Sequence, residues 1–90
     1  MNKVERILST GLSVQEIIDT LSEIENPEDT KVAFVYESGD YWNTQLIVPV
    51  NEILISNPSY TDYHNKLKFD PEDSHDDISN IGENEIVTFI

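Results

Sequence analysis

Ninety residues are enough for one domain with one thin core, so we expect a single domain over residues 1–90. The chain has no cysteine, which excludes disulfides, thiolate metal sites and cysteine nucleophiles. Eighteen acidic residues against five basic ones give a net charge of −13. This charge argues against direct binding to nucleic acid or to an anionic membrane, and it favours a protein partner with a basic surface.

The N-terminal stretch MNKVERILSTG mixes charged and apolar residues, which is not the pattern of a signal peptide. The longest apolar runs, such as LIVPV at 46–50, are far shorter than the roughly 20 residues that cross a bilayer. We therefore expect a soluble, non-secreted protein of the cytoplasm.

Two helices are predicted at the start of the chain, over about residues 2–10 and 14–24. Gly11 separates them and is typical of a helix end. Ser13 and Glu16 have the spacing of a capping box, which starts the second helix. Behind this box the second helix carries an apolar stripe. The stripe consists of Val14, Ile17, Ile18, Leu21 and Ile24.

Strands are predicted over the next part of the chain, beginning with residues 31–37. That segment is apolar on both faces, which is typical of a central strand covered by the helix. The stretch ESGDYWNTQ follows as a turn and leads into a long apolar run, 44–56. Pro49 lacks a backbone N–H and is expected to divide this run in two.

The C-terminal third alternates polar segments with short apolar ones. Residues 57–65 are predicted to be irregular, and 66–69 to form a short edge strand with outward lysines. An acidic loop is predicted over 70–85, followed by a final strand at 85–90. The predicted fold class is α+β, with one or two N-terminal helices packed on one face of a small, mostly antiparallel sheet of three to five strands.

The sequence contains no pattern typical of a catalytic site. No serine lies in a G-x-S-x-G elbow, and the three glycines form no phosphate-binding loop. Eighteen acids make carboxylate pairs certain by chance, so such pairs do not point to acid–base chemistry. We therefore expect no catalytic residues, no cofactor and no enzyme activity.

The acidic run at 70–77 is the clearest candidate for a metal site, because hard cations prefer clustered carboxylates. An EF-hand loop starting at Asp70 would need Gly at its sixth position and Glu at its twelfth, but His75 and Ile81 stand there. We assign no metal ligand. A weak divalent-cation module using Asp70, Asp73, Asp76 and Asp77 stays open as an alternative.

Five residues in turns and irregular segments are the candidate partner-binding residues. They are Asp40, Tyr41, Trp42, Tyr60 and Tyr63. Exposed Trp and Tyr side chains often anchor protein interfaces. The competing interpretation, which is common in small domains and which we favour from sequence alone, is that Trp42 folds back over the open end of the core.

The acids gather in two parts of the chain and form a candidate acidic surface. Its members are Glu16, Asp19, Glu23, Asp70, Glu72, Asp73, Asp76 and Asp77. Carboxylates fixed at phosphate-like spacing can occupy a DNA-binding protein, so a DNA mimic is an alternative function. A homo-oligomer with the strand marked by Pro49 at its interface also stays open.

The capped helix SVQEIIDTLSEI, the segment NPEDTKVAFV and the segment GDYWNTQLIVPVNEI together resemble a loose class of small, acidic, helix-then-strands proteins of bacteriophages. The resemblance spans roughly residues 12–55. It implies an accessory protein made in the cytoplasm of an infected bacterium, where such proteins often bind a host protein. It implies no activity for any residue. We therefore expect a protein that binds another protein.

Overall fold

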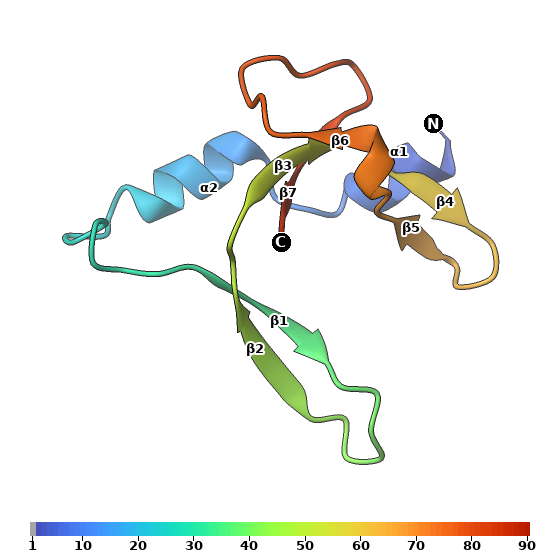
Figure 1. Ribbon diagram of the computed structural model, residues 1–90, viewed down its shortest axis with the longest axis horizontal. Helices are drawn as coiled ribbons and strands as arrows, with labels where there is room; N and C mark the ends of the chain where they lie inside the picture. The colour runs from blue at the N-terminus through green and yellow to red at the C-terminus, as the bar shows by residue number, and fades with distance from the viewer. Residues whose placement is uncertain (1) are drawn as a thin grey trace.

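The computed structural model describes residues 2–90, which form two short α-helices and seven short strands (Figure 1). The helices are α1 (Lys3–Leu8), α2 (Val14–Leu21) and the 3-10 turn η1 (Pro71–Asp73). The strands are β1 (Ala33–Glu37), β2 (Gln45–Pro49), β3 (Ile53–Ser56), β4 (Ser59–Thr61), β5 (Lys66–Lys68), β6 (Ser74–His75) and β7 (Ile86–Phe89). The α+β class predicted from the sequence is confirmed.

The second helix begins at the capping box that the sequence predicts. The Ser13 hydroxyl accepts a hydrogen bond from the Glu16 amide at 3.1 Å, and the Glu16 carboxylate accepts one from the Ser13 amide at 3.1 Å. Both α-helices are shorter than the predicted 2–10 and 14–24, because Ser9 and Ser22 cap their C-terminal ends. Ile24 therefore lies beyond α2.

All strand pairs are antiparallel, and they form three small sheets. A three-stranded sheet has the order β6-β3-β7, whereas β1 pairs with β2 and β4 pairs with β5 in separate hairpins. The central position predicted for 31–37 is wrong, because within residues 2–90 β1 has only β2 as a neighbour. In Figure 1 the β1–β2 hairpin projects away from the other strands.

The remaining strands differ from the predicted elements in number and in bounds. The run 44–56 is divided at Pro49 into β2 and β3. The segment 57–65 is not wholly irregular, because it contains β4, and the loop 70–85 contains η1 and β6. The strands predicted at 66–69 and 85–90 are shortened to β5 and β7. Hydrogen bonds to the distant strand β3 define β6, whereas β4 is defined by its hairpin pairing with β5, which the polar sequence of 57–65 does not indicate.

The core of the described structure is very small and lies at the end of β3. Ile55 is fully buried and Ser56 is 2% exposed. Pro58, just after β3, is buried as well. The Ser56 and Thr88 hydroxyls are 2.6 Å apart and join β3 to β7, so the buried hydroxyl has a partner. Stability therefore depends on a few side chains between β3 and its two neighbours.

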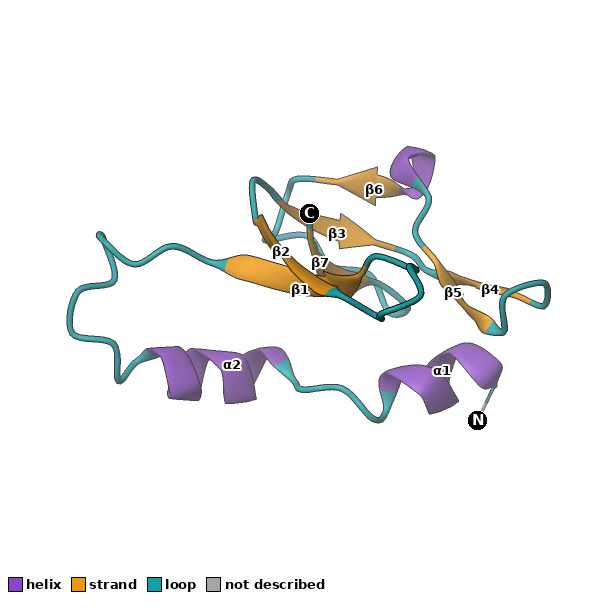
Figure 2. Ribbon diagram, turned by 90° about the horizontal axis from the view of Figure 1, so that it is seen from below, coloured by secondary structure: helices purple, strands orange, loops and turns teal. Residues whose placement is uncertain are grey.

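The two α-helices lie on one side of the strands (Figure 2). Helix α1 contacts β4. The apolar stripe of α2 stays largely open to solvent, with Val14, Ile18 and Leu21 exposed by 50, 53 and 46%. Among residues 2–90, no helix has the length and apolar character needed to cross a membrane.

Candidate functional site

The tip of the β1–β2 hairpin is held by the side chain of Asp40. One carboxylate oxygen accepts a hydrogen bond from the Thr44 amide at 3.0 Å, and the other accepts one from the Thr44 hydroxyl at 2.9 Å. The Asp40 amide donates to the Ser38 hydroxyl at 3.2 Å. Asp40, a predicted partner-binding residue, therefore organises the loop from within.

The backbone of the tip uses two left-handed residues. Gly39 has φ of 80° and Asn43 has φ of 53°. Glycine and asparagine are the residues that adopt this region most readily. The Ser38 amide donates to the Thr44 carbonyl at 3.0 Å, which closes the loop above the last strand pair. The loop thus has a defined shape that fixes the two residues at its apex.

Tyr41 and Trp42 stand at this apex, exposed by 87 and 80%. Their rings meet edge to face, with centroids 5.2 Å apart. This geometry is favoured by the charge distribution of aromatic rings. The interpretation in which Trp42 folds over the core is wrong, because Trp42 is 80% exposed and lies at the tip of a hairpin that projects away from the β6-β3-β7 sheet (Figure 1).

Hydrogen bonds from Thr44 lower the pKa of Asp40 below its ordinary 3.8. Because the folded pKa lies below the unfolded one, this contribution to loop order is present above the unfolded pKa. It is lost as pH falls through the folded pKa. We expect the Thr44 amide proton shift in NMR to titrate with a midpoint below 3.8, and Asp40→Asn to abolish that titration.

A matched control uses Asp77, whose pKa is lowered in the same way by the hydroxyl and amide of Ser79. Asp77→Asn should leave the Thr44 titration unchanged, since the two carboxylates belong to different loops. A Thr44 midpoint at or above the ordinary pKa of Asp40 would contradict the role given to its carboxylate.

The other two predicted aromatic anchors lie on a different hairpin. Tyr63 is 89% exposed at the turn between β4 and β5, with its ring edge to face with His64 at 4.7 Å. Tyr60 is partly buried; its hydroxyl donates to Asn65 at 3.0 Å, and the Lys3 ammonium lies 4.6 Å from its ring centre. The two hairpins are separate sheets and point in different directions (Figure 1), so these aromatics belong to a different hairpin from the first pair.

Several carboxylates of the predicted acidic surface are bound within their own segments. Glu16 belongs to the capping box of α2, and Asp19 accepts a hydrogen bond from Gln15 at 2.8 Å. Asp70 caps η1, and Asp77 accepts from Ser79. The remaining members, Glu23, Glu72, Asp73 and Asp76, are exposed. The acids therefore occupy two regions of the chain, one on and just after α2 and one around η1 and β6.

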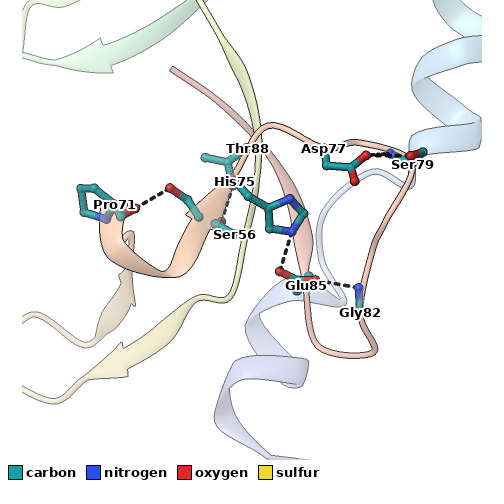
Figure 3. Close-up of polar contacts among 9 residues, drawn as sticks. Ser56, Pro71, His75, Asp77, Ser79, Gly82, Glu85 and Thr88 are labelled. Atoms are coloured by element: carbon teal, nitrogen blue, oxygen red, sulfur yellow. Dashed lines mark hydrogen bonds and ion pairs between the residues drawn. The ribbon is translucent and has the colours of Figure 1, made fainter.

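Positive charge does little to neutralise these acids. Within residues 2–90 the ion pairs are Lys3–Asp62 at 3.7 Å and His75–Glu85 at 3.2 Å. The second pair joins β6 to the segment before β7, and Glu85 also accepts from the Gly82 amide at 2.7 Å (Figure 3). No sequence signal indicates this pair, because β6 is set by its pairing with β3.

In the part of the chain that the structure describes, no group of three or more His, Asp or Glu side chains could hold a metal ion. The cation alternative therefore gains no geometric support. The candidate site with a defined geometry is the hairpin tip.

Comparison of the chain with protein-family models, with curated proteins and with solved structures finds no match. The resemblance to phage accessory proteins thus stays a prediction. The function must be derived from the residues of the chain itself.

Proposed function

We propose that this chain is a non-catalytic binding protein that engages another protein through the tip of its β1–β2 hairpin. The observation that carries the proposal is the exposed pair Tyr41 and Trp42, held at the apex of a hydrogen-bonded loop. Large rigid aromatic side chains contribute most of the energy at many protein interfaces. They lose little conformational entropy on binding because they have only two rotatable bonds.

The charge of the chain supports a basic partner. A net charge of −13 with two ion pairs among the described residues leaves most carboxylates available to attract positive charge. Such a field raises the association rate and is screened by salt. The tip would then contribute the apolar anchor, and the carboxylates would steer the partner toward it.

We infer that binding, not catalysis, is the activity. The sequence supports this inference, because it has no G-x-S-x-G elbow and no glycine-rich phosphate loop. Following the resemblance to phage proteins, we propose the cytoplasm of an infected bacterium as the setting.

A DNA-binding protein is one class of basic partner, which makes DNA mimicry the alternative form of the function. The hydrogen bonds of Asp70 and Asp77 fix some carboxylates in place, as mimicry requires. A displacement assay separates the two forms. A mimic releases DNA from its target at stoichiometric protein, whereas a binder at another surface leaves the DNA bound.

Copurification from the source cell at low salt tests the proposal. We expect the wild-type chain to retain a basic protein, the retained protein to be released as salt rises, and the double variant Tyr41→Ser/Trp42→Ser to lose it. Tyr63→Ser is the matched control, because it removes an equally exposed tyrosine from the other hairpin. Equal retention by the tip variant and the wild type would reject the proposal.

A further inference from the structure

The β1–β2 hairpin has an apolar face that nothing covers within residues 2–90. Cross-strand pairing places Ala33 opposite Pro49 and Val35 opposite Ile47 on this face. Val35 is 60% exposed and Ile47 is 73% exposed. A two-stranded hairpin is at best marginally stable in water without a third strand or a helix against it. The paired strands β1 and β2, which form the stem of this hairpin, therefore require another strand or a helix packed against this apolar face.

Helix α2 has an apolar face that lacks a sheet to pack against in the part of the chain that the structure describes. Its stripe is half-exposed along its length, and an eight-residue helix is not stable without packing. Its N-terminal half borders β7 across an open groove of about 650 Å³, lined by Val14 and Ile18 on one side and Val87 and Phe89 on the other. The groove separates the helix from β7, so the apolar stripe of α2 stays about half exposed.

The chain exposes more surface than a compact monomer of the same mass. The chain exposes 7720 Å² at a mass of 10.3 kDa, whereas a compact monomer of this mass exposes about 5,400 Å². The radius of gyration is 14.9 Å, compared with about 12 Å for a compact domain of this length. The excess of about 2,300 Å² in each copy is larger than the roughly 800 Å² that each partner buries in a standard-size interface, so each copy has enough excess surface for a stable dimer contact.

We propose that α2 of one copy packs on the stem of the β1–β2 hairpin of a second copy, and that the exchange is reciprocal. Each chain has an exposed apolar helix face and an exposed apolar sheet face. A two-fold axis between two copies brings the helix of each copy against the sheet of the other, so both faces of both copies are buried. Eight helical residues span about 12 Å, and five strand residues span about 17 Å. The helix is therefore shorter than the stem, so it covers most of the stem and leaves the tip free.

The second copy is favoured over a different protein because each chain already supplies both complementary surfaces. Residues 22–32 connect the two elements and span up to about 36 Å when extended, so they permit the exchange. The self-contact is apolar and joins two chains of charge −13. Salt screens that repulsion and should strengthen the dimer, whereas salt should weaken the proposed contact of the tip with a basic partner.

Sedimentation equilibrium over a range of salt concentrations gives the first test. We expect twice the mass of 10.3 kDa, a dimer that tightens as salt rises, and a monomer for Ile18→Asp and for Ile47→Asp. Ile78→Asp is the control, because Ile78 is 59% exposed in a loop outside both surfaces. A wild-type monomer at every salt concentration overturns the proposal, as does a dimer that loosens with salt.

Disulfide trapping tests the specific contact and uses the absence of cysteine from the chain. Ile18→Cys and Ile47→Cys are made separately, mixed and oxidised. The proposal predicts a mixed disulfide dimer of the two variants. Dimers linked only between identical variants overturn the proposal. A double variant that closes the disulfide within one chain also overturns it, because the helix then covers its own hairpin. The dimer is independent of the proposed partner, since the tip variants should still dimerise.

Discussion

Ile55→Ala should lower the free energy of unfolding by about 2 to 5 kcal/mol. Ile55 is the one large hydrophobic side chain among residues 2–90 that is fully buried, and it lies in the middle strand of the β6-β3-β7 sheet. Its truncation removes apolar contacts and leaves a cavity between strands that have few other buried groups. Because natural domains are stable by about 5 to 15 kcal/mol, the loss is a large part of the total. Chemical denaturation at a fixed protein concentration measures it.

Ile78→Ala is the matched control for this substitution, since it deletes the same atoms from a side chain that is 59% exposed. We expect it to change the free energy of unfolding by less than about 0.5 kcal/mol. Similar losses for the two variants would show that β3 is not the centre of the stable structure.

Trp42→Ala should weaken binding to the basic partner by at least about 2 kcal/mol, or roughly 30-fold in Kd. The substitution removes the largest ring from the tip together with its edge-to-face contact with Tyr41. Since Trp42 is 80% exposed in the free chain, its removal should leave the free energy of unfolding almost unchanged. Titration calorimetry with the copurified partner measures the affinity, and denaturation measures the stability.

Tyr63→Ala provides the control for affinity, because Tyr63 is as exposed as the tip residues but belongs to the β4–β5 hairpin. It should leave Kd within about two-fold of the wild-type value. If Trp42→Ala and Tyr63→Ala weaken binding equally, the tip is not the anchor.

The sequence predicts the elements whose signals are local. The capping box of Ser13 and Glu16 gives the start of α2, and Gly39 with Asp40 gives the turn of the first hairpin. Pro49 marks the division between β2 and β3. Each of these signals acts through the backbone conformation or hydrogen bonding of a few neighbouring residues, so it can be found without knowing the tertiary structure.

The elements and contacts that the sequence does not predict depend on distant partners. Strand β6 exists through its pairing with β3, and the His75–Glu85 ion pair depends on that placement. An apolar stripe shows that a helix or strand has a face to bury, but not which surface buries it. For this reason the sequence indicates a covered β1 and a packed Trp42, whereas the structure leaves both exposed.

Collisional quenching of the single tryptophan tests the central claim that the hairpin tip is a free anchor that a partner covers. We expect acrylamide to quench Trp42 in the unbound protein nearly as efficiently as it quenches free indole, and to quench it much less once the basic partner is bound. Strong protection of Trp42 in the unbound protein, or unchanged quenching in the complex, would contradict the account.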